Sequence, residues 1–271
     1  MEKPPLPAGV QPCAVVSGVR RQEIGPGNHD RSTTVLSCMP DLRRHLADAL
    51  SAANAFFGIL SCVAALSGRA DVSLLLLIAG AVCDGLDGAA ARRFGGTRFG
   101  VLADDVADAI SYGIAPAIAV AVVTQGLAGT VVGVVYGALT LTRLVYFTLH
   151  KGLPGDDPRV FRGLPSTVGA VIALSAAILW SQTPVLVAFA AGAAVALMVG
   201  FDAGFLHPGR ALQALPRQQQ VKLVVVVVAV LGLALWSGPA VLATVALVAA
   251  GGYALTPPLS AFQRVLDARR A

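Results

Sequence analysis

The chain has 271 residues, of which 56% are hydrophobic and 13% are charged, and its formal net charge is +5. Soluble domains carry about 25% charged residues, so this composition excludes an ordinary water-soluble core. The basic residues lie between apolar stretches rather than on one amphipathic face. That arrangement favours a membrane topology signal over nucleic-acid binding. We therefore expect an integral membrane protein with no nucleic-acid partner.

Residues 1–40 differ from the rest of the chain, because they contain six prolines, scattered charges and no sustained apolar run. Such a segment cannot bury enough apolar surface to fold, so we expect a disordered tail. Residues 41–260 are expected to form one transmembrane domain, and residues 261–271 a short basic tail.

Beyond the first tail, the sequence contains about eight apolar stretches. Most approach the length of about 20 residues that crosses a hydrocarbon layer of about 30 Å. We predict helical membrane spans at about 46–67, 72–92, 99–124, 129–150, 166–182, 185–203, 219–236 and 239–257.

The connections between these spans alternate in charge. Those near 93–98, 151–165 and 204–218 carry arginine or lysine, whereas those near 125–128, 183–184 and 237–238 carry no charge. Of the 20 lysines and arginines, only Arg69 falls on the opposite side. The positive-inside rule therefore predicts a protein of the cell membrane whose two termini and 93–98 connection face the cytosol.

Four aspartates lie where the second and third spans meet that basic connection: Asp84, Asp87, Asp104 and Asp108. Intramembrane carboxylates cost about 2.5–3.5 kcal/mol each, so several together require a compensating partner. Spacings of three and four residues place each pair on one helix face. The spans run antiparallel about a turn near residue 96, so Asp84 lies level with Asp108, and Asp87 with Asp104. We therefore predict that all four carboxylates converge.

The helical rise places this cluster below the cytosolic surface, with Asp87 about 8 Å and Asp84 about 12 Å along the helix from Arg92. Clustered carboxylates repel one another unless cations neutralise them. Oxygen ligands suit Mg²⁺, Mn²⁺ or Ca²⁺. Gly88 and Ala91 leave room for a bulky ligand, and Arg92 can offer its planar fork to a phosphate.

An acid cluster inside a membrane is also typical of a cation pathway in a transporter. Transporters often contain internal repeats with interrupted helices at matching positions. Residues 166–257 contain no second copy of the aspartate pattern. A cation transporter therefore stays open as the alternative. A purely structural role is disfavoured, because nothing would then offset the free-energy cost of burying the acids.

The full pattern is Asp84-x2-Asp87-Gly88-x2-Ala91-Arg92-x7-Gly100-x3-Asp104-x3-Asp108. It resembles the signature of the CDP-alcohol phosphotransferase family at all eight fixed positions. This resemblance implies an all-α integral membrane enzyme with a core of six helices, to which the chain adds two C-terminal spans. It also implies a site with two divalent ions, Mg²⁺ or Mn²⁺, that opens to the cytosol, and a homodimer.

By the same resemblance, the four aspartates bind metal and Asp108 is also the general base. Gly88, Ala91 and Arg92 would contact the cytidine nucleotide, and we place Gly100 and Asn54 in the same site for the CDP-linked lipid.

Three further segments resemble the CDP-diacylglycerol–serine O-phosphatidyltransferase branch of that family. They are Ser51-x2-Asn54-x3-Gly58, residues 107–117, in which Tyr112 stands where the branch has phenylalanine, and residues 161–166. The branch implies phospholipid biosynthesis, in which serine accepts a phosphatidyl group from CDP-diacylglycerol and CMP is released.

The chain also departs from the branch. Asp105 replaces a serine, and Tyr146 and Thr148 replace an arginine and an asparagine. Glycerol phosphate, inositol phosphate or an amino alcohol therefore stays open as the acceptor. Diacylglycerol and isoprenoid-ether donors are not distinguished. We expect acceptor or phosphate contacts from Ser111, Arg143 and Arg162.

Overall fold

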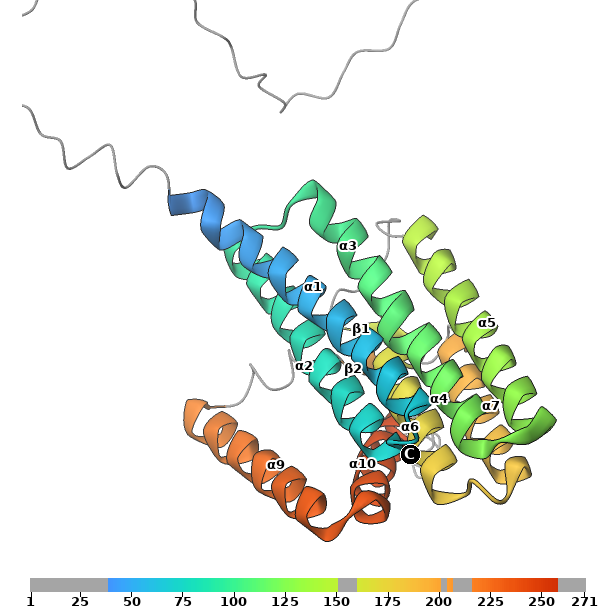
Figure 1. Cartoon of the computed structure of the whole chain (residues 1–271). Coiled ribbons are helices and arrows are strands. Elements are labelled where there is room, and N and C mark those ends of the chain that lie inside the picture. Colours follow the sequence, from blue (N-terminus) through green and yellow to red (C-terminus); the bar gives the residue numbers. More distant parts are fainter. Residues whose placement is uncertain (1–38, 151–159, 201–203, 207–215, 258–271) are drawn as a thin grey trace, which may run out of the picture. The chain divides into compact units, whose positions relative to one another are not determined.

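The computed structural model of the chain describes residues 39–150, 160–200, 204–206 and 216–257 (Figure 1). The predicted tails at 1–40 and 261–271 fall almost entirely outside these ranges, so both stay predictions. Within them, helices dominate, which confirms the all-α expectation.

The helices lie where the apolar stretches predict them. The long helices are α1 (Met39–Leu66), α2 (Ala70–Phe94), α5 (Gly126–His150) and α9 (Arg217–Ser237). A further continuous run consists of α3 (Arg98–Asp108), the π-helical turn η2 (Ala109–Ile114) and α4 (Ala115–Thr124). The short helices are α6 (Ser166–Leu179), α7 (Pro184–Val199) and α10 (Pro239–Ala254).

Among the described residues, five helices are long and apolar enough to cross a membrane. The three shorter apolar helices contain 14, 16 and 16 residues. At 1.5 Å per residue they extend about 21–24 Å, less than the hydrocarbon thickness of about 30 Å. These eight segments coincide with the eight predicted spans, while the number that crosses the membrane stays a prediction.

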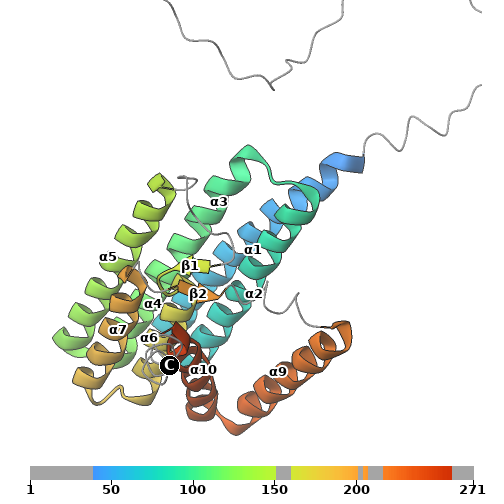
Figure 2. The same cartoon turned by 180° about the vertical axis from the view of Figure 1, so that it is seen from behind.

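Two short strands add a feature that the sequence does not predict. β1 (Val160–Arg162) pairs antiparallel with β2 (Gly204–Leu206), and Phe161 lies opposite Phe205 (Figure 2). The pairing places residues 160–162, which precede α6, beside residues 204–206, which follow α7. The alternation of charge along the sequence also places the connections that contain these residues on one side.

The apolar interior centres on α6, which packs against α2, α4, α7 and α10. Nine of its residues are buried, from Ser166 to Ala177. By contrast, many large apolar side chains on the other helices are exposed, including Phe56, Val134 and Phe189. Exposed apolar side chains on helices of this length are what a lipid environment requires.

Buried polar groups form hydrogen bonds between helix α1 and its neighbour α2. The Ser61 hydroxyl contacts the Ser73 carbonyl oxygen at 2.9 Å and the Ser73 hydroxyl at 2.8 Å, which joins α1 to α2. Near the middle of α1, Gly58 lies against Ser111 of η2, where a Cβ atom would stand 2.8 Å from the Ser111 Cα. This close approach positions α1 beside the aspartates.

The π-helical turn η2 begins directly after Asp108. Its wider turn is visible in the N–H of Ala115, which donates to the carbonyl of Ile110, five residues earlier. Within this turn Ser111, Tyr112 and Gly113 are all buried. Single π turns inside α-helices often occur at functional sites.

Candidate active site

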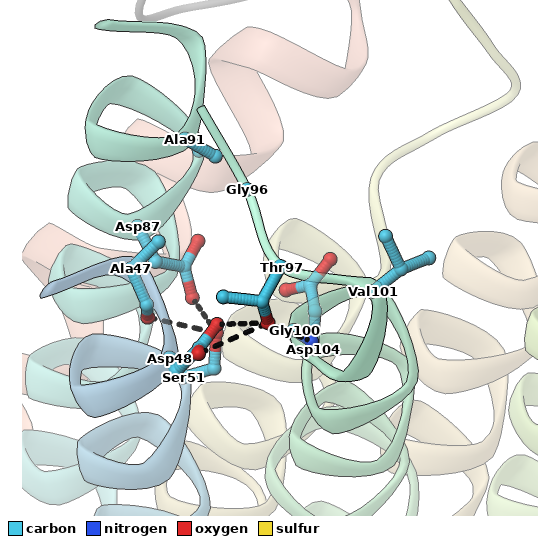
Figure 3. A pocket seen from close by; sticks show the side chains of 11 residues that line it. Ala47, Asp48, Ser51, Asp87, Ala91, Gly96, Thr97, Gly100, Val101 and Asp104 are labelled. Atoms are coloured by element: carbon cyan, nitrogen blue, oxygen red, sulfur yellow. Dashed lines mark hydrogen bonds between the residues drawn. The ribbon is translucent and has the colours of Figure 1, made fainter. Parts of the chain in front are cut away.

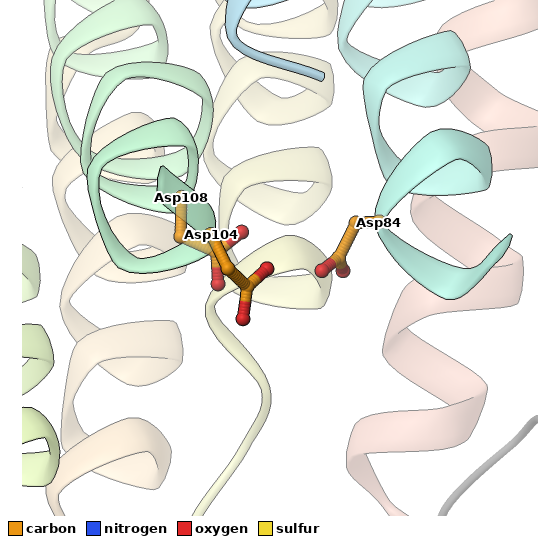
Figure 4. Close-up of side chains that lie close together, drawn as sticks. All are labelled: Asp84, Asp104 and Asp108. Carbon is orange, nitrogen blue, oxygen red and sulfur yellow. The ribbon is translucent and has the colours of Figure 1, made fainter. Parts of the chain in front are cut away.

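Three of the four predicted aspartates come together. Asp84 extends from α2 toward Asp104 and Asp108 on α3 (Figure 4), and one oxygen from each lies within 4.8 Å of the others. The α2–α3 hairpin and the four-residue spacing on α3 produce this arrangement. All three side chains are partly buried.

Asp87 is oriented differently, and the predicted convergence of all four carboxylates is correct for only three. The Asp87 side chain is 5% exposed and accepts a hydrogen bond of 2.7 Å from the Ser51 hydroxyl of α1. Asp87 nevertheless lines the same cavity as Asp104. It therefore lies beside the three-carboxylate group and joins it to α1.

The three-carboxylate group, Asp84, Asp104 and Asp108, fits a divalent cation. Its ligand atoms are all carboxylate oxygens, which Mg²⁺ and Mn²⁺ prefer. Three negative charges at this separation repel one another, and a bound cation would offset that repulsion. The geometry therefore supports metal binding, while the identity and number of the ions stay predictions.

An open cavity lies beside these acids, between α1, α2 and α3, with about 380 Å³ of empty space when the adjoining open solvent is included (Figure 3). Three small residues of the signature, Gly88, Ala91 and Gly100, line it, while their contact with a CDP-linked lipid stays a prediction. Arg92 is exposed, and a Cβ atom on Gly88 would lie 3.2 Å from its Nη1 atom. The guanidinium therefore lies directly against the glycine that lines the cavity.

The opposite wall of the cavity contains two residues that the sequence analysis missed, Asp48 and Thr97. Thr97 caps α3 by accepting a hydrogen bond of 2.8 Å from the Gly100 N–H. Its hydroxyl donates to the Asp48 carboxylate, whose oxygens lie at 3.0 and 3.1 Å (Figure 3). A Cβ atom on Gly100 would overlap the Asp48 Oδ1 atom. The sequence does contain a signal for Asp48, because positions 48, 51 and 54 are polar at a spacing of three along an apolar helix.

Asn54 and Ser111 lie behind the acids rather than in the cavity. Both side chains are fully buried. The Asn54 amide donates to Asp108 Oδ1 at 3.3 Å, and the Ser111 hydroxyl donates to the Asn54 carbonyl oxygen at 2.9 Å. Neither side chain is among those that line the cavity, and each supports a neighbouring residue. Their contacts with the lipid donor and the acceptor stay predictions.

The sequence region that builds this site matches a known family. A family model described as CDP-alcohol phosphatidyltransferase matches residues 44–201. The chain belongs to this family. The match includes all four aspartates, and it leaves the cation-transporter alternative without support.

Curated relatives in this family cover part of the chain. A CDP-diacylglycerol–serine O-phosphatidyltransferase of Helicobacter pylori is 31% identical over 129 residues, 45% of this chain and 52% of the relative. A CDP-diacylglycerol–serine O-phosphatidyltransferase of Mycobacterium leprae is 33% identical over 120 residues, which are 42% of this chain and 40% of the relative. An archaetidylserine synthase of Methanothermobacter thermautotrophicus is 32% identical over 148 residues, 53% and 59%. The chain thus spans about half the length of the curated relatives it matches.

Two arginines, Arg143 and Arg162, are predicted as acceptor or phosphate contacts, and both contacts stay predictions. Arg143 is buried, its Nε donates to the Met198 carbonyl at 2.9 Å, and its guanidinium lies 4.6 Å from the centre of the Phe147 ring. It therefore joins α5 to the end of α7 and does not extend to a membrane surface. Arg162 belongs to β1, and its side chain lies outside the described part of the structure.

Proposed function

We propose that this chain is a metal-dependent phosphatidyltransferase of phospholipid biosynthesis. It transfers the phosphatidyl group of a CDP-linked lipid to the hydroxyl of serine and releases CMP. The observation that carries this proposal is the three-carboxylate group beside a cavity lined by small signature residues, in a chain of the CDP-alcohol phosphatidyltransferase family.

Asp84, Asp104 and Asp108 would hold a divalent ion, with Asp87 available from the neighbouring wall for a second one. Bound Mg²⁺ or Mn²⁺ supplies positive charge that stabilises the reacting phosphate oxygens and the departing CMP. We propose two ions in the active enzyme, as the family resemblance implies.

The remaining steps follow from the side chains. The small residues of the cavity admit the nucleotide, and Arg92 can bind a phosphate oxygen with its fork of N–H groups. Asp108 accepts the proton of the serine hydroxyl, because an alcohol is a weak nucleophile near neutral pH. The serine oxygen then forms a bond to the lipid-linked phosphorus, the bond from that phosphorus to the bridging oxygen breaks, and the electron pair leaves with CMP.

The wall formed by Asp48 suits the cytosine base. A carboxylate only accepts hydrogen bonds, and the exocyclic amine of cytosine is a donor that carboxylates recognise. Uracil presents a carbonyl oxygen at that position, which the carboxylate would repel. The Thr97 hydroxyl holds the Asp48 carboxylate at the cavity by a hydrogen bond. Gly100 leaves the space that this carboxylate occupies, because it has no side chain. We therefore propose that Asp48 favours CDP-linked over UDP-linked donors.

Serine is the preferred acceptor because the names of all three relatives described above refer to serine or its lipid product. The names differ in the lipid they refer to, since one refers to CDP-diacylglycerol and another to archaetidylserine, so the lipid part of the donor belongs in the test as well. Tyr146 and Thr148 depart from the branch, so glycerol phosphate, inositol phosphate and amino alcohols belong in the same test.

We further propose that the site and both termini face the cytosol across the cell membrane, and that the enzyme is a homodimer. The charge alternation supports this orientation. A water-soluble acceptor and a membrane-bound donor can meet only near a membrane boundary, which agrees with a site near the basic 93–98 connection.

The purified protein should be assayed for CMP release with CDP-diacylglycerol or CDP-linked ether lipid, Mg²⁺ or Mn²⁺, and the panel of alcohols. We expect CMP and a serine lipid in equal amounts, and loss of both when EDTA removes the metal. CMP release that occurs only with another alcohol would show that this alcohol, and not serine, is the acceptor. No CMP release with any donor and acceptor would overturn the proposed function.

A further inference from the structure

Asp108 is held from behind by a hydrogen-bonded chain that begins at the Tyr112 side chain of η2. Outside this chain, the Tyr136 hydroxyl of α5 donates to the backbone carbonyl oxygen of Tyr112 at 3.2 Å. The Tyr112 hydroxyl donates to Asn54 Oδ1 of α1 at 3.2 Å, and Asn54 Nδ2 donates to Asp108 Oδ1 at 3.3 Å. Both tyrosines and Asn54 have at most 1% of their surface exposed.

The amide of Asn54 has one orientation that satisfies this chain. Its oxygen faces the Tyr112 hydroxyl, so its NH₂ group must face the Asp108 carboxylate. The reverse orientation would point the amide oxygen at a carboxylate oxygen. The backbone of Gly80 closes the space on another side, where a Cβ atom would stand 2.8 Å from Asn54 Oδ1. A buried amide that loses one partner loses the interaction that selects its orientation.

We propose that the Tyr112 hydroxyl is a positioning group for Asp108, because it fixes the Asn54 amide that in turn holds Asp108 Oδ1. This inference rests on the proposed function, in which Asp108 binds metal and accepts the acceptor's proton. The amide occupies one carboxylate oxygen and leaves the remaining acceptor sites of Asp108 for metal and substrate. Groups that orient a metal-binding side chain typically change metal affinity by about 10–100-fold when removed.

The motif that residues 107–117 resemble has phenylalanine, which lacks the hydroxyl, at the position of Tyr112. Removing the hydroxyl should therefore weaken the site without abolishing it, and we expect the lower end of that range. The matched control is Tyr136, a second buried tyrosine whose hydroxyl bonds the Tyr112 backbone and not the Asn54 amide.

The test compares Tyr112→Phe with Tyr136→Phe in the purified full-length protein. We expect about a tenfold weaker Mn²⁺ affinity for Tyr112→Phe, measured by electron paramagnetic resonance of free Mn²⁺, and less than a twofold change for Tyr136→Phe. We expect kcat to fall about tenfold in Tyr112→Phe, while the donor KM changes less than twofold. Both variants lose one buried hydroxyl, so their thermal unfolding temperatures should fall by similar amounts.

A double-mutant cycle tests the route through the amide. In the Asn54→Leu background, Tyr112→Phe should change Mn²⁺ affinity less than twofold, because the group through which Tyr112 acts is gone. Equal Mn²⁺ affinities of Tyr112→Phe and Tyr136→Phe, or additive effects in the cycle, would overturn the positioning role. If no CMP release occurs with any substrate, the proposed function fails, and the Mn²⁺ comparison alone still decides the positioning role. A wild-type protein that binds no Mn²⁺ would overturn the positioning role, and one that also releases no CMP with Mg²⁺ would overturn the proposed function as well.

Discussion

Residues 99–124 and residues 217–237 are both apolar helical segments long enough to cross a membrane, yet they are used in opposite ways. Their mean hydropathies are 1.9 and 2.2. In the first, 44% of the most apolar window is buried inside the protein, against 6% in the second. The first contains two of the clustered aspartates, and among the described residues of α9 only Ala234 is buried.

The difference teaches that hydropathy finds membrane helices but does not tell which face meets protein. In lipid, apolar side chains gain little by leaving the bilayer, so packing between helices depends on polar groups and close backbone approach. The run from α3 through α4 offers both, in Asp108, Ser111 and Gly113. Helix α9 has no polar side chain from Leu223 to Leu235, and a Cβ atom on its Gly232 would meet nothing within 4 Å. It also lies outside residues 44–201, the part that matches the family. The candidate site is therefore built without α9.

The largest effect that this comparison predicts is at Asp108. In Asp108→Asn, the amide cannot accept a proton, so CMP release should fall about 10²–10⁴-fold. The side chain keeps its size, so CMP binding in the presence of Mn²⁺ should be affected far less, as isothermal titration would measure. Asp105→Asn, on the same helix but outside the three-carboxylate group, is the matched control. Normal turnover in Asp108→Asn would exclude Asp108 as the base.

The next effect concerns the contact between α1 and η2. In Gly58→Ala, the new Cβ atom would overlap the Ser111 hydroxyl oxygen and stand 2.8 Å from its Cα. Forcing the helices apart should cost about 1–3 kcal/mol, because buried overpacking is relieved only by backbone shifts. The expected result is a lower Tm in detergent together with reduced CMP release. An unchanged Tm would mean that α1 and η2 do not approach as closely as described.

A smaller effect is expected at Asp48. In Asp48→Asn, the side chain can present an NH₂ group to the carbonyl of uracil, so the preference for CDP-linked over UDP-linked lipid should fall about tenfold. The measurement is the ratio of kcat/KM for the two donors. His45→Gln removes the 3.3 Å contact of the His45 ring with Asp48 and keeps the carboxylate, so its ratio should match the wild type. An unaltered ratio in Asp48→Asn would mean that the cytosine base does not bind at Asp48.

Much of this architecture could be predicted because its causes are local. Runs of apolar residues define the helices, and spacings of three and four residues around a short turn bring Asp84, Asp104 and Asp108 together. The two strands could not be predicted, since three residues give no periodic signal. Their pairing depends on contacts between connections that lie 42 or more residues apart in the chain.

The orientation of Asp87 and the role of Asn54 could not be predicted for a different reason. The spacing of Asp87 from Asp84 predicts a shared face, but the hydroxyl of Ser51 on α1 determines where its carboxylate points. Likewise the pattern that includes Asn54 marks the residue as part of the site, while only the packing of α1 against η2 shows that it lies behind Asp108. Both outcomes depend on contacts between separate helices.

The smallest predicted effect repeats the Gly58 substitution in α9. In Gly232→Ala, the new Cβ atom would meet nothing within 4 Å. Alanine in a helix interior is favoured over glycine by about 0.5–1 kcal/mol, so the Tm should stay the same or rise slightly, with unchanged CMP release. The two variants make the same chemical change in helices of similar hydropathy, and only the neighbours of the glycine differ. A fall in Tm as large as that of Gly58→Ala would show that this face of α9 packs against protein. The contrast between residues 99–124 and residues 217–237 would then be wrong.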